Sequence, residues 1–444
     1  MEQQNKMGTA KMGPLIFSMA LPAMISMIIN ALYNIVDSIF VAKYSQDALA
    51  AVSLVYPLEM LVVAIGVGTG VGVNSLIARR LGERRQEAAD LAAEHGVALS
   101  VIGGIAFFII GWGLSGAFVG AFGASEAVST NAVQYSHIAV GMSIFVLISM
   151  MCEKIQQSGG NMIIPMCQGL AGAIINIILD PLMIFGIGPF PRMEIAGAAL
   201  ATGIGQVITL LVYLIYYVAD PLPVKLHKKY LRPEGDICSK TYGIGIPATL
   251  NMALPSLLIS ALNGILAAYS GAYVLVLGVY YKLQTFIYLP SNGIIQGIRP
   301  LIGYYYGAGE RNRVEQIYRL TLELTAGIMA IGTALCWLIP GGLIGLFTEN
   351  PETVTIGITA LHIISLGFIL SAVSVTSSGA LEALGQGMAS LVISVMRYVA
   401  VIIPAAFVLS RLIGVTGVWW AFVCTESVTA MVAYVLYRKV WKRA

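Results

Sequence analysis

Residues 97–122 read VALSVIGGIAFFIIGWGLSGAFVGAF, a run of 26 residues without a charged side chain. A helix crosses the roughly 30 Å hydrocarbon core of a bilayer with about 20 apolar residues, so this stretch is long enough to span a membrane. Its residues are continuously apolar and do not alternate with polar ones, which argues against a strand of a transmembrane β-barrel. The run therefore predicts a membrane-spanning helix.

The rest of the chain has the same character. Of its 444 residues, 58% are hydrophobic and 11% are charged, whereas a soluble domain has roughly half apolar and a quarter charged residues. The first apolar run is about 30 residues long and leads into further runs, so we expect it to be a span and not a cleaved signal peptide. The sequence predicts an all-α integral membrane protein with twelve transmembrane helices. The predicted spans are residues 13–42, 48–78, 93–121, 130–153, 160–186, 193–219, 242–268, 272–300, 315–347, 352–380, 386–410 and 413–437.

The basic residues predict how these spans are oriented. With twelve spans, both termini and every second loop share one side, and 19 of the 25 Lys and Arg residues fall on that side. Cytoplasmic loops carry the excess of Lys and Arg, so we expect both termini in the cytoplasm. The exceptions are Lys43, Arg192 and Arg411 on the other side and Lys282, Arg299 and Arg397 within spans.

The chain contains an internal repeat with an offset of 225 to 227 residues. Six spans per repeat give both halves the same orientation, so the sequence predicts two six-helix bundles related by a pseudo-two-fold axis along the membrane normal. The predicted domains are an N-lobe at 1–219, a basic cytoplasmic linker at 220–241 and a C-lobe at 242–444. The matching segments are Leu21-Pro22-Ala23 and Ile246-Pro247-Ala248, Tyr44-Ser45 and Tyr269-Ser270, and Gly82-Glu83-Arg84 and Gly309-Glu310-Arg311.

Two aspartates lie inside spans of the first half. Asp37 belongs to the first span and Asp180 to the fifth, and the second half has no acid at either matching position. Charged side chains are costly in a membrane and usually serve an ion or substrate pathway. Tyr33 and Asn176 each precede one of these acids by four residues and therefore share its helical face.

Thr202 and Gln206 repeat the same spacing on the sixth span. If these faces converge, they form a pocket with two carboxylates that cannot both ionise cheaply, and such a pair can carry H⁺ or bind Na⁺. The alternative is that the aspartates only bind neighbouring helices. Glu59 is either part of this pocket or a local anchor.

Two further residues are weaker candidates. Lys282 is a deep cation of the eighth span, either a substrate or coupling residue or a side chain that reaches the interface. Pro22 removes a backbone hydrogen bond from the first span, which favours a hinge there, although a fixed kink would need the same residue.

Several activities lack support in the sequence. There is no P-loop and no long loop for an ATPase domain, and the four histidines are isolated from one another. The five cysteines show no paired spacing for a disulfide framework or a zinc site. We therefore expect no enzymatic activity, no cofactor other than the coupling ion, and no nucleic acid partner.

The chain resembles the multidrug and toxic compound extrusion (MATE) transporters, in particular their prokaryotic DinF-like or MepA-like members. The first span carries Pro22 and Tyr33-Asn34-Ile35-Val36-Asp37, and the fifth carries residues 176–186, NIILDPLMIFG. In the second half, residues 296–308 read QGIRPLIGYYYGA. The likeness covers nearly the whole chain.

The resemblance implies export of amphipathic, often cationic drugs or toxic metabolites by antiport with H⁺ or Na⁺, which would contribute to antibiotic resistance. It implies an ion site at the positions Tyr33, Asp37, Asn176, Asp180 and Thr202. Members with coupling acids in the seventh and tenth spans differ from this chain, where Glu382 ends the tenth span. A lipid or polysaccharide-precursor flippase and a non-transporting membrane protein remain alternatives. We expect a monomer in the lipid bilayer, and the resemblance implies that this bilayer is the inner membrane of a prokaryotic cell.

Overall fold

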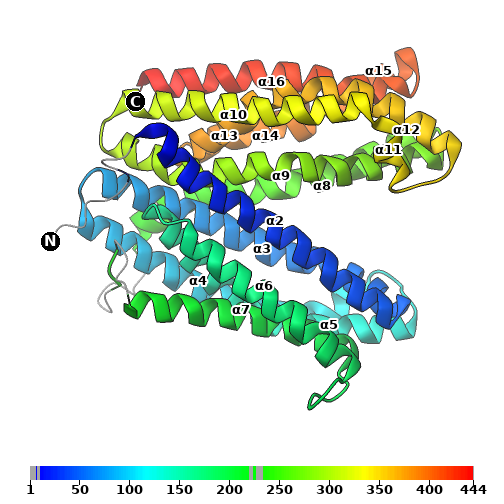
Figure 1. Ribbon diagram of the computed structural model, residues 1–444, viewed down its shortest axis with the longest axis horizontal. Helices are drawn as coiled ribbons and strands as arrows, with labels where there is room; N and C mark the ends of the chain where they lie inside the picture. Colours follow the sequence, from blue (N-terminus) through cyan, green and yellow to red (C-terminus); the bar gives the residue numbers. More distant parts are fainter. Residues whose placement is uncertain (1–6, 8–10, 220–223, 227–233, 444) are drawn as a thin grey trace. The chain divides into compact units, whose positions relative to one another are not determined.

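The computed structural model describes residue 7 and residues 11–219, 224–226 and 234–443, and within these ranges it is helical with no strand (Figure 1). Twelve helical segments are long and apolar enough to cross a membrane, as predicted. The tenth combines α12, η2 and α13, and the eleventh combines α14, a π-helical turn and α15. The elements are α2 (Met12–Tyr44), α3 (Gln46–Gly82), α4 (Gln86–Gly120), α5 (Glu126–Ser158), α6 (Ile163–Phe185), α7 (Glu194–Ala219), α8 (Gly235–Ala267), α9 (Gly271–Gly307), α10 (Arg311–Leu338), α11 (Pro340–Gly345), α12 (Pro351–Ile364), η2 (Ser365–Gly367), α13 (Phe368–Ala383), α14 (Gly387–Val395), η3 (Met396–Ala400), α15 (Ile402–Ile413) and α16 (Thr416–Arg443).

Several predicted boundaries were wrong by more than a helical turn, and two of them show the causes. The ninth span was expected to reach residue 347, but α10 ends at Leu338. Pro340 has no N–H to donate and its ring disfavours a helical residue before it, so the chain breaks there and restarts as the short helix α11. The seventh span begins at Gly235, seven residues before the predicted start, because α8 continues into polar sequence.

The starts of two helices show the repeat in local structure. The Ser45 hydroxyl accepts hydrogen bonds from the backbone N–H groups of Asp47 and Ala48 at the start of α3. Ser270 accepts in the same way from the N–H of Ala272 at the start of α9. Serine is a preferred N-cap because it satisfies backbone donors that have no partner in the helix. The second helix of each half therefore begins with the same capping residue.

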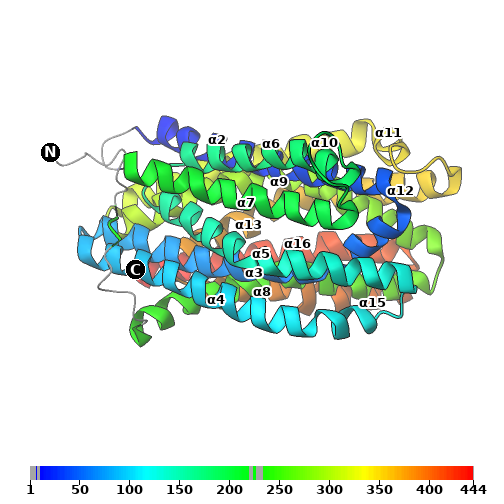
Figure 2. The same ribbon diagram turned by 90° about the horizontal axis from the view of Figure 1, so that it is seen from below.

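The chain divides into two compact units. The first comprises residues 1–9 and 25–246, and the second comprises residues 10–24 and 247–444. In the first unit, α3 packs against α4 and α5, and α6 packs against α7 (Figures 1 and 2). Half of the linker predicted at 220–241 lies outside the described residues, and the predicted domain boundaries stay a prediction.

The first helix of each half is shared between the two units. Residues 12–24 of α2 belong to the second unit, and residues 235–246 of α8 belong to the first. In both helices the change of unit falls close to a proline, Pro22 or Pro247, and these prolines are 225 residues apart. The repeat therefore extends to the way each half begins.

Glycines on α3 and α9 receive these shared segments. A Cβ atom placed on Gly297 of α9 would lie 2.8 Å from Cα of Ala20, and one on Gly72 of α3 would lie 2.3 Å from the carbonyl oxygen of Thr241. Small residues allow helix backbones to approach this closely in membrane proteins. Gly72 and Gly297 are also 225 residues apart, so both halves use the same packing device.

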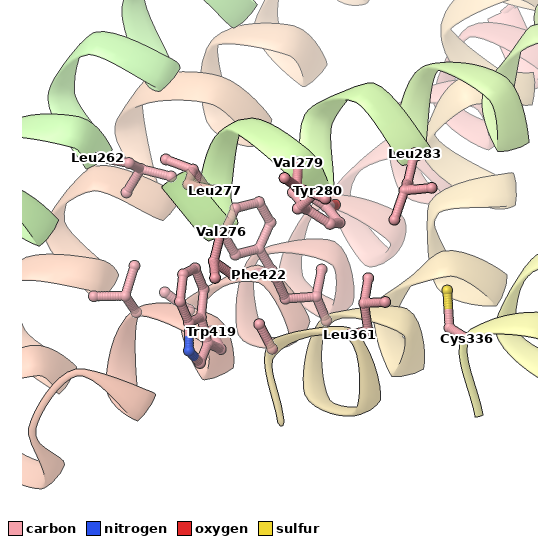
Figure 3. Packing of buried hydrophobic residues seen from close by; sticks show 14 of the residues in the cluster. Leu262, Val276, Leu277, Val279, Tyr280, Leu283, Cys336, Leu361, Trp419 and Phe422 are labelled. Atoms are coloured by element: carbon pink, nitrogen blue, oxygen red, sulfur yellow. The ribbon is translucent and has the colours of Figure 1, made fainter. Parts of the chain in front are cut away.

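Aromatic and aliphatic side chains fill the core of the second unit (Figure 3). Tyr280 of α9 packs edge to face on Phe422 of α16, with ring centroids 5.3 Å apart. Trp419 of α16 is buried in the same cluster. These contacts provide the second unit with a hydrophobic core of its own.

A Trp–His contact occurs in both halves and was not predicted. The rings of Trp112 and His137 stack with centroids 4.3 Å apart, and those of Trp337 and His362 lie 5.1 Å apart. Both residues of the second pair follow those of the first by 225 positions. This contact therefore belongs to the repeated scaffold.

Candidate functional site

Polar residues from α2, α6 and α7 meet inside the first unit. Asn176 and Asp180 lie one turn apart on α6, and the Asn176 side-chain amide donates to Oδ1 of Asp180 at 3.3 Å. The same amide nitrogen is 3.2 Å from the Thr202 hydroxyl of α7. Both Asn176 and Asp180 are almost completely buried. The amide therefore orients the carboxyl group and links α6 to α7.

The side chains of α2 complete this cluster. The carboxyl group of Asp37 contacts that of Asp180 at hydrogen-bonding distance, and the Tyr33 hydroxyl contacts Thr202. A hydrogen bond between two carboxyl groups requires a proton on one of them. The five residues predicted for the ion site thus lie together, while their role in coupling stays a prediction.

Each aspartate also has one oxygen without a donor. Oδ1 of Asp37 and Oδ2 of Asp180 are buried and receive no hydrogen bond from the described residues. A buried carboxylate oxygen without a donor is costly. The pair can be satisfied by a proton or by a small cation held between oxygen atoms.

Glu59 extends the cluster from α3 toward α5. Its Oε1 accepts a hydrogen bond from the Tyr135 hydroxyl at 3.0 Å, and its carboxyl group is close enough to Asp37 and the neutral Tyr33 phenol to interact with them electrostatically. Beside Glu59 is a cavity of about 10 Å³, also lined by Phe107, which has room for about one water. The structure therefore places Glu59 next to the pocket. Tyr135 could not be predicted from the sequence as a partner of Glu59, because the two residues are 76 positions apart.

The remaining candidates are not part of this cluster. Gln206 lies one turn beyond Thr202, and within the described residues it makes no hydrogen bond to the aspartates. Lys282 belongs to the second unit, where its amine lies 5.6 Å from the centre of the Phe347 ring. Pro22 is buried inside the continuous helix α2, so its role as a hinge stays a prediction.

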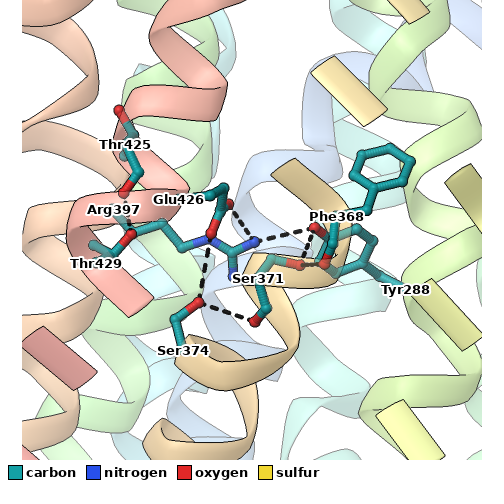
Figure 4. A network of polar contacts seen from close by, with 8 residues as sticks. All are labelled: Tyr288, Phe368, Ser371, Ser374, Arg397, Thr425, Glu426 and Thr429. Carbon is teal, nitrogen blue, oxygen red and sulfur yellow. Dashed lines mark hydrogen bonds and ion pairs between the residues drawn. The ribbon is translucent and has the colours of Figure 1, made fainter. Parts of the chain in front are cut away.

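The second unit contains a buried ion pair that was not predicted from the sequence. Figure 4 shows Arg397 of the π-helical turn η3 bound to Glu426 of α16, with Nε and a terminal nitrogen each 2.7 Å from Oε1. Arg397 also reaches the Tyr288 hydroxyl at 3.3 Å, which pairs with Ser371 at 2.6 Å. The wider helical turn brings this guanidinium into the unit and joins four helical segments.

Another polar group joins the seventh and tenth spans. Glu382 forms an ion pair with Arg299 at 2.6 Å and accepts from the Asn251 amide at 3.1 Å. Glu382 is in the last turn of α13, as predicted, but it is buried and neutralised by a cation. This differs from the first unit, where no described basic residue pairs with Asp37 or Asp180.

No group of three or more His, Cys, Asp or Glu side chains suited to a metal occurs among the described residues. For Na⁺, the available oxygen ligands would be those of Asp37, Asp180, Tyr33 and Thr202. This set contains the carboxylate and neutral oxygens that a hard cation accepts. Both coupling ions therefore remain compatible with the donor atoms.

Comparisons with known proteins identify the family. A family model described as MatE matches residues 22–182 and 247–408, more than half of the chain. Multidrug export protein MepA of Staphylococcus aureus (strain MSSA476) is 26% identical over 422 residues, which cover 94% of this chain and 91% of MepA.

Solved structures show the same fold. A MATE protein in the straight conformation has a TM-score of 0.92 and 25% identity, and the match covers 100% of this chain and 99% of that one. An outward-facing multidrug resistance MATE family transporter of the MOP superfamily has a TM-score of 0.91 and 24% identity, covering 99% and 98%. The chain is therefore a twelve-helix membrane protein that belongs to the MatE family of transporters.

Proposed function

We propose that the chain is a secondary active multidrug efflux antiporter that exports amphipathic, often cationic compounds by alternating access. Family membership and the similarity to multidrug export protein MepA support the transport of small molecules. The contact between the carboxyl groups of Asp37 and Asp180 supports coupling to an ion. That contact is the observation on which the proposal rests.

Between the two candidate ions, the geometry favours H⁺. Two carboxyl groups in contact share a proton without further ligands, whereas Na⁺ must sit between several oxygen atoms at once. Proton binding would remove the charge of the pair in a buried site, and proton release would restore it. Binding and release would therefore change the electrostatics around Tyr33 and Asn176 in each transport cycle.

The transporter would act in the cell membrane as a multi-pass protein with both termini in the cytoplasm. The excess of basic residues on the side of the termini supports this orientation. It would act as a transporter and not as an enzyme, since the charged cluster lies inside membrane-spanning helices and the sequence has no nucleotide-binding loop.

Efflux from reconstituted vesicles tests the proposal. A fluorescent cation is loaded, and proton and sodium gradients are imposed separately. We expect efflux with the proton gradient, and its loss in Asp37→Asn and Asp180→Asn. The matched control is Asp47→Asn, which also removes one carboxylate. Asp47 lies in the first turn of α3, where α2 and α3 are connected.

Three results would contradict this proposal. Undiminished efflux in both aspartate variants would remove the coupling role of the pair. A response to sodium alone would replace H⁺ by Na⁺ at the same residues. If efflux from vesicles with the parent protein did not depend on either gradient, the result would favour a membrane protein that does not transport.

A further inference from the structure

The second unit contains a cavity between the ends of α8 and α15. Its volume is about 460 Å³, which falls in the range of small-molecule sites, about 300–1,000 Å³. One wall carries Ala261 and Gly264 of α8 and Ala268 directly after it, and the α15 wall carries Phe407 and Arg411. All of these residues belong to the second unit, so the cavity is a property of that unit alone.

Small residues keep the space beside α8 open. Ala261, Gly264 and Ala268 are three and four positions apart and therefore share one helical face. A Cβ atom on Gly264 would have no heavy atom within 4 Å. This face can accommodate an apolar chain along the helix.

The other wall adds a cation. The Arg411 guanidinium lies 5.3 Å from the centre of the Phe407 ring and forms no ion pair with any acid in the described ranges. Phe407 and Arg411 are both exposed. Arg411 therefore presents an unneutralised positive charge next to apolar surface.

A hydrogen bond keeps the two walls together. The hydroxyl of Tyr269, in the loop after α8, donates to the carbonyl oxygen of Ser410 on α15 at 2.8 Å. In the first half the equivalent Tyr44 lies under the Arg192 guanidinium, 5.6 Å from it. Each half thus attaches the end of its first helix to the chain around the end of its fifth.

The repeat relates this cavity to the acidic pocket. Leu262 occupies the position of Asp37 after an offset of 225, and Ala406 that of Asp180 after 226. Both are completely buried, so the acids of the first half are replaced by core residues. Among the described residues that line the cavity, the only charged one is Arg411, and its positive charge favours an anion over the cations expected at the acidic pocket.

We propose that this cavity binds a phospholipid with an anionic headgroup, with the phosphate on Arg411 and an acyl chain on the small-residue face of α8. Arg411 is in the last turn of a membrane-spanning helix, at the level of the lipid headgroups, where a guanidinium can pair with a phosphate group. The exposed Phe407 favours a ligand with an apolar part over a soluble anion. This site is separate from the acidic pocket and does not depend on the proposed antiport.

Photo-crosslinking locates the ligand in the unmodified protein. The probe is phosphatidylglycerol with a diazirine on its acyl chain, incorporated into vesicles with the full-length protein. We expect crosslinked peptides from residues 261–268 and 407–411. Crosslinks confined to other helices would overturn the proposal without any variant being needed.

Native mass spectrometry tests the chemistry of recognition. The purified protein is offered an equimolar mixture of phosphatidylglycerol and phosphatidylcholine. We expect preferential retention of phosphatidylglycerol, and a loss of about fivefold in that preference for Arg411→Gln, the factor that one basic residue near anionic lipid provides. Lys43→Gln, which removes an exposed cation at the matching end of the first unit, should leave the preference unchanged.

Filling the cavity gives a second variant with its own control. Gly264→Leu should lower the retention of both lipids, whereas Gly327→Leu, at an exposed glycine of α10 with equally free space, should not. Equal retention of the two lipids by the parent protein would overturn the proposal. Displacement of the lipid by inorganic phosphate alone would also overturn it, because the site would then recognise a soluble anion.

Discussion

Replacing Gly297 by alanine would place a methyl group where α9 and α2 already touch. The new Cβ atom would lie 2.8 Å from Cα of Ala20 and from the carbonyl group of Met19. Carbon atoms normally remain 3.5–4.0 Å apart. Because these neighbours are backbone atoms, the clash cannot be relieved by rotating a side chain. The two helices must therefore separate by a substantial fraction of an ångström.

The size of the effect follows from two opposing terms. Alanine is more favourable than glycine in a helix interior by about 1 kcal/mol, and overpacking costs about 1–3 kcal/mol. Gly278 of the same helix is exposed and has no atom within 4 Å of its Cβ position. Gly278→Ala therefore has the favourable helix propensity of alanine without the cost of overpacking. We expect this variant to be more stable than Gly297→Ala by about 1–3 kcal/mol.

Thermal unfolding of the purified variants in detergent measures this difference. We expect an unfolding midpoint for Gly297→Ala below that of the parent, and one for Gly278→Ala at or above it. Gly72→Ala should lose more than Gly297→Ala, because its Cβ would lie 2.3 Å from the Thr241 carbonyl oxygen. Equal midpoints for the Gly297 and Gly278 variants would refute the close approach of α2 and α9.

Three further predictions concern buried polar groups. Glu59→Gln removes a charge near the acidic pocket, and it should slow efflux driven by a proton gradient by less than Asp37→Asn does. Unchanged efflux would mean that Glu59 is not one of the residues that couple proton movement to transport. Glu426→Gln leaves the Arg397 charge buried without its partner and should lower the free energy of unfolding by about 3–5 kcal/mol. Unfolding with denaturant measures this loss. The loss should be smaller when both Arg397 and Glu426 are replaced by leucine. Asn176→Leu removes an amide donor at 3.3 Å from the Asp180 carboxyl group and should weaken proton-driven efflux at a nearly unchanged expression level.

Properties that repeat along one helix could be predicted from the sequence. The apolar runs predicted twelve spans because the length of a span depends on the thickness of the bilayer. The four-residue spacing predicted that Asn176 and Asp180 share a face, and they are hydrogen-bonded in the structure. Span ends were less predictable where the chain breaks inside an apolar run, as it does at Pro340.

Contacts between distant helices could not be predicted. The Glu59–Tyr135 bond joins residues 76 positions apart, and the Arg397–Glu426 pair depends on a π-helical turn. Both require a particular rotation of each helix about its axis, which packing decides and local sequence does not encode. The glycines that contact α2 and α8 could be recognised in the sequence as small residues. The segments that they contact could not be predicted from the sequence.

The comparison of the two halves separates the scaffold from the chemistry. Positions that pack backbone against backbone are the same in both, as with Gly72 and Gly297, because the same close approach must be made twice. The buried aspartates of the first half have no acidic counterpart in the second, as with Asp37 and Leu262. A transporter built from two similar halves needs matching scaffolds to change conformation, but a charge that binds an ion is needed only once. The second half can therefore use the corresponding space for a ligand of opposite charge.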